Sequence, residues 1–218
     1  MININTNFVK RFATSIILLL ILFLSLSLNN KLWLLLLLIT ALICFIEFKN
    51  MIRRIFKSNY LVYLSNFFIF IYLLFFVFSS FKIYSSPPSL LIFSLLVCIF
   101  SDTGGYLVGK TFGGKKLTKI SPNKTISGSL GSFIFSLIPA LAILNFYDAL
   151  SHTFVITATL IMSFICQSGD LLISLFKRKA NVKDTGSILP GHGGLLDRID
   201  GMIFVIPITY YVQKMITI

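Results

Sequence analysis

Seven long runs of residues with almost no acidic or basic side chain dominate the pattern of this sequence. A helix crosses a bilayer with about 20 predominantly apolar residues. The run 15–28 is continuously apolar, which excludes the alternating pattern of a strand in a membrane barrel. We therefore predict membrane-spanning helices over residues 12–30, 32–46, 58–81, 83–101, 125–147, 149–169 and 201–218.

The composition indicates the same class of protein. Hydrophobic residues make up 56% of the 218 residues, charged residues make up 12%, and the mean hydropathy is +0.93. A soluble domain carries about 25% charged residues, so a soluble globular protein and a disordered chain are excluded. We expect an all-α, polytopic membrane protein with about seven transmembrane helices, in a range of about 6–9, because the run 32–46 is short and the last run contains Lys214.

The basic residues predict the orientation of the spans. The chain has 19 Lys and Arg against 7 Asp and Glu, a formal net charge of +12. In a membrane protein such an excess collects in cytoplasmic loops beside anionic lipid. With the N-terminus inside, only Lys31, Lys82 and Lys214 fall outside the cytoplasmic segments. We expect a multi-pass protein of a bacterial inner membrane that contacts the lipid bilayer and no nucleic acid.

The remaining polar residues concentrate in two predicted cytoplasmic loops, 102–125 and 170–200. These loops hold five of the seven acidic residues and most of the glycines. Carboxylates at the ends of membrane helices are costly unless they face a partner, a metal or a wet cavity. We therefore predict a catalytic region over residues 89–218 and a scaffold of transmembrane helices over residues 1–88.

One polar stripe follows the sixth predicted span. If the chain stays helical there, Asp170, Ser174, Lys177 and Arg178 lie on one face, at i, i+4, i+7 and i+8. A carboxylate that reaches the interface beside its basic neighbours would explain the stripe structurally. The functional interpretation is a metal-binding carboxylate followed by cations that hold phosphates.

A glycine-rich turn and two further carboxylates come next. Gly191, Gly193 and Gly194 surround His192, and glycines let backbone N–H groups approach a ligand closely; a plain interfacial turn is the alternative. Asp197 and Asp200 are three residues apart, with Arg198 between them. They form either a local salt-bridge cluster or part of the sparse oxygen set that Mg²⁺ prefers when phosphates supply the other ligands.

Two other features are given structural interpretations. The segment 104–111 fits the P-loop pattern, but it leaves an apolar membrane run and follows no strand, so we reject a P-loop. The loop 102–125 as a whole, which precedes the loop 170–200 in the chain, is rich in Gly and Lys and therefore suits an anionic ligand. Glu47 is expected to form an interfacial ion pair with the nearby Lys49.

The C-terminal half resembles the phosphatidate cytidylyltransferase family, also called CDP-diacylglycerol synthases. The signature is carried by Ser174-Leu175-Phe176-Lys177-Arg178, Lys183-Asp184 and Pro190-Gly191-His192-Gly193-Gly194-Leu195-Leu196-Asp197-Arg198-Ile199-Asp200. Segments 102–106 and 121–125 are similar to a second conserved region of that family. Segment 167–170 is similar to the residues that precede the signature. Ser127 and Ile173 depart from it, because many members carry Glu there.

The resemblance implies a Mg²⁺-dependent nucleotidyltransferase of phospholipid biosynthesis. Such enzymes join CTP and phosphatidic acid to give CDP-diacylglycerol and pyrophosphate. The implied catalytic residues are Asp170, Lys183, Asp197 and Asp200. Asp170 and Asp197 are implied to bind Mg²⁺ together. The sequence does not decide whether a second metal ion binds or whether the protein forms a homodimer. The residues implied to bind the substrates are Asp102, Ser121, Lys124, Ser174, Lys177, Arg178, Asp184, Gly191, His192, Gly193, Gly194 and Arg198.

Three alternatives remain beside this interpretation. A CTP-dependent polyprenol kinase would use the same residue types but transfer the γ-phosphoryl group. A transporter would place polar residues near the midplane of several spans, whereas here they cluster in two loops on one side. Because Ser127 and Ile173 replace the usual Glu, an inactive homologue is the third alternative.

Overall fold

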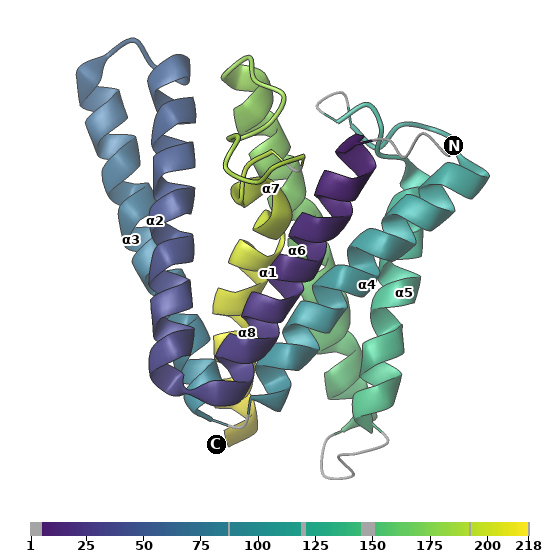
Figure 1. Cartoon of the computed structure of the whole chain (residues 1–218). Helices are drawn as coiled ribbons and strands as arrows, with labels where there is room; N and C mark the ends of the chain where they lie inside the picture. Colours follow the sequence, from purple (N-terminus) through teal and green to yellow (C-terminus); the bar gives the residue numbers. More distant parts are fainter. Residues whose placement is uncertain (1–5, 87, 119–120, 145–150, 192, 218) are drawn as a thin grey trace. The chain divides into compact units, whose positions relative to one another are not determined.

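The computed structural model describes residues 6–86, 88–118, 121–144, 151–191 and 193–217 (Figure 1). The chain is helical along most of this length because its apolar runs contain few helix-breaking residues. The helices are α1 (Thr6–Leu28), α2 (Asn30–Ile55), α3 (Asn59–Ser85), α4 (Ser89–Phe112), α5 (Ile126–Leu144), α6 (His152–Lys179), α7 (Leu196–Ile199) and α8 (Met202–Thr217).

The predicted helical membrane fold is confirmed. Helices α2 to α6 are long and apolar enough to cross a membrane, and the apolar stretches Ala13–Leu28 and Met202–Ile216 are shorter. Each of the seven predicted spans therefore corresponds to a helix in the described part of the chain. Five of these helices are both long enough and apolar enough to cross a membrane.

Several helices continue beyond the predicted membrane spans, for one physical reason. We expected spans to stop at charged residues, but Lys and Glu are good helix formers and do not end a helix. Helix α2 runs through Glu47 to Ile55, and α3 runs through Lys82 to Ser85. Likewise α4 includes residues 102–112 and α6 includes residues 170–179, so both predicted loops begin as helix.

The chain forms two compact units. Unit 1 contains residues 1–81 and 176–199, and unit 2 contains residues 82–175 and 200–218. The predicted functional division after residue 88 stays a prediction.

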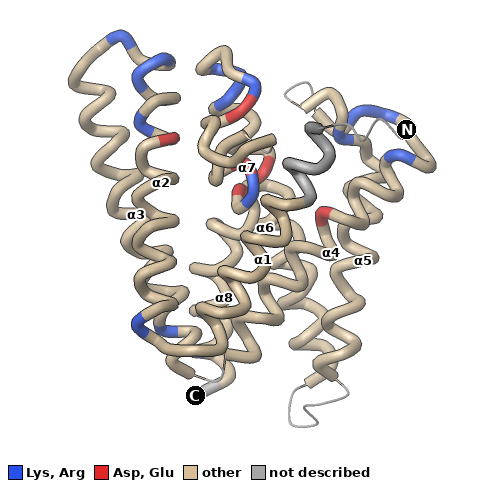
Figure 2. The backbone as a smooth tube through the Cα atoms, in the orientation of Figure 1, with Lys and Arg blue, Asp and Glu red and all other residues tan. Residues whose placement is uncertain are grey.

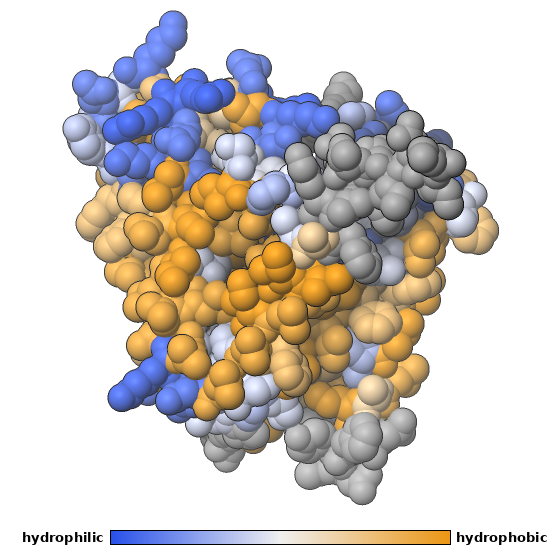
Figure 3. Space-filling view, in the orientation of Figure 1, coloured by the Kyte–Doolittle hydropathy of each residue, from blue (hydrophilic) through white to orange (hydrophobic). Residues whose placement is uncertain are grey.

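In unit 1, helix α2 is the central element. It packs against α1 and contacts the short helix α7, and Phe48 of α2 meets the ring of Phe176 edge to face, with centroids 6.1 Å apart. Figure 3 shows an apolar surface over α2 and α3 between polar ends. Exposed side chains such as Phe67, Phe68 and Phe78 contribute to it, as expected for helices that face lipid.

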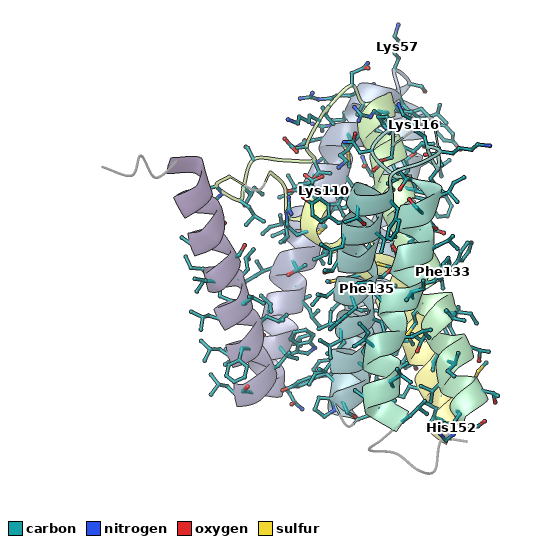
Figure 4. The ribbon with its side chains drawn as sticks, turned by 90° about the vertical axis from the view of Figure 1, so that its right-hand side faces the viewer. Lys57, Lys110, Lys116, Phe133, Phe135 and His152 are labelled. Carbon is teal, nitrogen blue, oxygen red and sulfur yellow. The ribbon has the colours of Figure 1, made fainter. Side chains whose placement is uncertain are left out.

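In unit 2, helices α4 and α5 pack most closely, and Figure 4 shows them side by side with Phe135 at their contact. A Cβ on Gly104 of α4 would lie 2.6 Å from the carbonyl oxygen of Gly131 on α5 and 2.4 Å from Cβ of Phe135. Small residues allow this backbone approach between membrane helices. The buried core around them comprises Phe93, Val97, Cys98, Ala140, Leu144, Val155, Met162, Cys166 and Val205.

The basic residues lie at the ends of the helices. In unit 1, Arg53 and Arg54 lie in the last turn of α2, where Figure 2 shows a group of basic residues, and Lys57 projects from the turn between α2 and α3 (Figure 4). In unit 2, Lys110 and Lys116 lie at one end and His152 lies at the opposite end (Figure 4). The segment 104–111 lies inside α4, so it is not the strand-to-helix loop of an NTPase.

Candidate functional site

A polar cavity of about 340 Å³ opens in unit 2. Four elements surround it: α4, the loop before α5, α5 itself and α6. Its lining residues are Asp102, Gly105, Tyr106, Leu117, Ser121, Asn123, Lys124, Thr125, Gly128, Ser129, Ser132, Gln167 and Asp170. The structure thus brings together four residues singled out from the sequence: Asp102, Ser121, Lys124 and Asp170.

An ion pair lies in this cavity. The ammonium of Lys124 contacts Oδ2 of Asp170, and each side chain is 27% exposed. Ser174, one turn further along α6, donates a hydrogen bond of 3.5 Å to Oδ1 of Asp170. Because water reaches both charges, the pair contributes little to stability. Its partners can therefore exchange for a ligand at small cost.

A third carboxyl group, that of Asp200, meets Asp170 at the start of α8. Burial, followed by the negative charge of Asp170, a hydrogen bond between the two carboxyl groups and the charge of Asp102, raises the pKa of Asp200 to about 8. These surroundings therefore favour the protonated form of Asp200. Within the described residues, no group of three His, Cys, Asp or Glu side chains lies close enough together to hold a metal ion.

A row of polar side chains continues from the cavity between the helices of unit 2. Ser129 donates a hydrogen bond of 2.6 Å to Oε1 of Gln167, and Gln167 donates one of 3.4 Å to Ser163. Ser163 in turn lies 3.0 Å from the hydroxyl of Ser101. Sequence analysis did not propose Gln167 or Ser129 as site residues, although a lone amide inside an apolar run indicates a helix-to-helix contact.

The two positions that depart from the family pattern have internal roles. The hydroxyl of Ser127 donates to the carbonyl oxygen of Gly113 and lies 3.0 Å from Oγ1 of Thr125. Ile173 is fully buried. Neither position offers a charge to the cavity.

In unit 1, Asp197 is the centre of a second polar cluster. Its Oδ1 accepts a hydrogen bond of 2.7 Å from Lys177, and its side chain is 6% exposed. Its Oδ2 accepts from the backbone N–H of Thr185 at 2.8 Å and from that of Gly194 at 3.1 Å. Burial alone would raise the pKa of Asp197, but Lys177 and these N–H donors outweigh it and hold the pKa below its ordinary value.

The glycine-rich turn closes on itself beside Asp197. The N–H of Leu189 donates to the carbonyl oxygen of Gly193 at 3.0 Å. Gly191 and Gly193 have φ values of 77° and 83°, a region that side chains other than glycine rarely adopt. The local turn therefore requires these two glycines, and their predicted approach to a triphosphate stays a prediction. His192 lies outside the described residues.

The expected ion pair between Glu47 and Lys49 is wrong. Glu47 is 2% exposed, and its carboxylate accepts hydrogen bonds from Thr185 at 2.7 Å, from the N–H of Leu195 at 3.0 Å and from that of Leu196 at 2.9 Å. Helix periodicity could have excluded the pair, because residues at i and i+2 do not face each other. Neither Glu47 nor Thr185 was among the site residues predicted from the sequence.

The predicted site residues are divided between the units. Asp170 belongs to unit 2 and Asp197 to unit 1, so their convergence on one ion stays a prediction. Unit 2 holds Asp102, Ser121, Lys124, Asp170, Ser174 and Asp200; unit 1 holds Lys177, Arg178, Lys183, Asp184, Gly191, Gly193, Gly194, Asp197 and Arg198. Among the latter, Arg178, Lys183 and Arg198 are exposed.

The sequence is similar to proteins of one known family. Residues 59–216 match the cytidylyltransferase family. A phosphatidate cytidylyltransferase of Staphylococcus aureus is 48% identical over 120 residues, which cover 54% of this chain and 46% of that protein. Those of Staphylococcus haemolyticus and Staphylococcus epidermidis are 47% and 42% identical over the same shares of the two chains. The matched part is thus about half of each curated relative.

Proposed function

Because this chain belongs to the cytidylyltransferase family, we propose that it transfers CMP from CTP to phosphatidic acid, which gives CDP-diacylglycerol and pyrophosphate. The observation that carries the proposal is the family match over residues 59–216, because it includes every residue of the polar cavity and the whole glycine-rich turn. The named activity of the staphylococcal relatives agrees with it.

The proposed reaction requires charge neutralisation more than proton transfer. An oxygen of the lipid phosphate attacks the α-phosphorus of CTP, a new P–O bond forms, and the bond to the β-phosphate breaks as pyrophosphate leaves. Since the attacking oxygen is already anionic, the site needs no strong general base. Its tasks are to align the two phosphates and to stabilise the charge that develops between them.

The cavity of unit 2 offers groups suited to these tasks. Its volume of about 340 Å³ lies within the usual range of ligand pockets, about 300–1,000 Å³. Lys124 is the basic residue among the lining residues, and its partly exposed ion pair with Asp170 lets it bind a phosphate when Asp170 binds a cation. Ser121 and Asn123 supply neutral hydrogen-bonding groups in the same wall.

Mg²⁺ fits the acidic residues of unit 2. Asp170 contacts Lys124, and burial, followed by the negative charge of Asp170, raises the pKa of the neighbouring Asp200. A divalent cation would offset the negative charge of carboxylates in such a site, and carboxylates with substrate phosphates are its ordinary ligands. When bound, Mg²⁺ neutralises phosphate charge. From the family resemblance we assign Asp170 and Asp197 as its protein ligands.

The exposed cations of unit 1 complete the proposal. Arg178, Lys183 and Arg198 are exposed around the Asp197 cluster, and arginine and lysine side chains are typical binders of phosphates. We assign them, with Lys177, to the phosphates of the substrates. The positive-inside pattern further supports a cytoplasmic site in a bacterial inner membrane, where the lipid tails stay in the bilayer.

The test uses the full chain purified in detergent with CTP, phosphatidic acid and Mg²⁺. We expect pyrophosphate release that depends on phosphatidic acid, stops when EDTA removes the divalent ions, and falls at least about 100-fold in Asp170→Asn. CDP release with a polyprenol would identify a kinase instead. A wild-type rate in Asp170→Asn would contradict the metal assignment.

A further inference from the structure

Glu47 is an acidic residue that the proposed reaction leaves without a role. It lies on α2, before the first residue of the family match at residue 59, and it is 2% exposed. A carboxylate buried in this way is strongly unfavourable unless donors surround it. Its donors therefore indicate what the residue is for.

All the hydrogen-bond donors observed for Glu47 come from the segment that carries the family signature. Its Oε1 accepts from the N–H of Leu195 at 3.0 Å. Its Oε2 accepts from the N–H of Leu196 at 2.9 Å and from the hydroxyl of Thr185 at 2.7 Å. The donors stand 138 to 149 residues after Glu47 in the chain. One side chain of α2 thus holds both ends of the glycine-rich turn.

The contact extends through Thr185 to Asp197. The hydroxyl of Thr185 lies 3.0 Å from Oδ2 of Asp197 as well as 2.7 Å from Glu47, and its single hydrogen serves one of the two carboxylates at a time. The backbone N–H of Thr185 donates to the same oxygen of Asp197 at 2.8 Å. Moving Thr185 therefore moves Asp197 and, through it, the ammonium of Lys177.

Two glycines, Gly186 and Gly194, leave room for the carboxylate of Glu47. A Cβ on Gly194 would lie 2.6 Å from Oε2 of Glu47 and 2.1 Å from Oγ1 of Thr185, and a Cβ on Gly186 would lie 2.6 Å from Oε1 of Glu47. Real Cβ atoms do not approach heavy atoms so closely. The absence of a side chain at these positions is thus explained by the buried carboxylate of Glu47.

We propose that Glu47 is a positioning residue for cytidylyl transfer: it fixes the segment around the glycine-rich turn that holds Asp197, the assigned metal ligand, beside Lys177. The inference rests on the proposed function and adds a residue from the N-terminal helices to its machinery. Glu47 acts through Thr185 and the backbone of Leu195 and Leu196, and it touches no substrate. A small displacement of a positioned group lowers a rate by up to about 100-fold.

The test compares two variants of Glu47, Glu47→Gln and Glu47→Asp, and two variants of Thr185, Thr185→Ser and Thr185→Val. Lys49→Gln, on the same helix as Glu47, is the matched control. In Glu47→Gln one carboxylate oxygen becomes an NH₂ that faces backbone donors, so we expect kcat to fall about 10- to 100-fold while KM for phosphatidic acid stays within about twofold. Amide hydrogen exchange should become faster over residues 185–199 and stay unchanged over α4 and α5. Thr185→Ser should retain most of the rate that Thr185→Val loses.

The outcomes separate this proposal from the proposed function. A wild-type chain without cytidylyl transfer contradicts both the proposed function and the positioning role. Activity in the wild type together with an unchanged kcat in Glu47→Gln and Thr185→Val contradicts the positioning role alone. Equal losses in Lys49→Gln and Glu47→Gln would also overturn it, because Lys49 makes none of these contacts.

Discussion

At the scale of single residues, the two acidic positions taken as metal ligands differ in their surroundings. Asp170 shares a partly exposed ion pair with Lys124, whereas Asp197 is enclosed by Lys177, two donors of Thr185 and the backbone N–H of Gly194. Asp170 is therefore available to a ligand at once, and Asp197 also organises the fold around it. Substitutions should separate these two roles.

Asp197→Asn should lower both stability and activity. The amide has one acceptor oxygen for four donors, and its NH₂ would face an ammonium or an N–H group. We expect the free energy of unfolding to fall by about 2–4 kcal/mol, as when one partner of a buried ion pair is removed. Thermal unfolding in detergent measures the loss. An unchanged melting temperature would contradict the contacts described for Asp197.

Lys124→Gln should lower activity with little loss of stability. Its ion pair with Asp170 is partly exposed to water and contributes about 1 kcal/mol or less, but the lost charge would raise KM for CTP or lower kcat by about tenfold or more. Lys115→Gln is the matched control, because Lys115 is exposed and lies outside the cavity lining. Equal kinetics of the two variants would exclude Lys124 from the site.

Asp200 gives the protein a dependence on pH in the absence of divalent ions. Its pKa is raised to about 8, so the folded chain holds a proton that the unfolded chain loses near pH 4. The associated stability is fully present below pH 4 and is lost as the pH rises through about 8. Melting temperatures between pH 5 and 9 should therefore fall more in the wild type than in Asp200→Asn. Parallel curves would contradict the raised pKa.

At the scale of helices, most elements could be predicted from the sequence and their ends could not. Each predicted span became a helix because a continuous apolar run in lipid has no other way to satisfy its backbone. Helix ends depend on caps and tertiary contacts instead of charge, so α4 and α6 continue past Asp102 and Asp170. The sequence predicted that the Gly- and Lys-rich loop 102–125 suits an anionic ligand, but it did not predict that Gly104 within it serves the packing of α4 on α5.

Gly104→Leu should therefore damage the fold of unit 2. Any side chain at this position would meet the carbonyl oxygen of Gly131 and Cβ of Phe135 within 3 Å. Overpacking of this kind costs about 1–3 kcal/mol or more. Leu130→Ala on α5, where the side chain is 59% exposed, is the control and should unfold at the wild-type temperature. Equal melting temperatures for all three proteins would contradict the close contact.

At the scale of the whole molecule, functional residues that are close in the sequence belong to different compact units. The glycine-rich turn belongs to the same unit as α1 and α2, and Asp170 belongs to the other. Asp102, Ser121, Lys124 and Asp170, which the polar loops and the family resemblance singled out, line one cavity, and their role in the reaction stays a prediction. Sequence analysis could not predict that Glu47 contacts Thr185, because a contact over 138 residues leaves no local pattern.

The fate of the phosphates of CTP tests the central proposal most directly. The purified chain is incubated with phosphatidic acid and CTP labelled either at the α- or at the γ-phosphorus, and the label in the lipid extract is counted. Cytidylyl transfer predicts that the α-label enters the lipid while the γ-label leaves as pyrophosphate. Entry of the γ-label into lipid, or of neither label, would contradict the account.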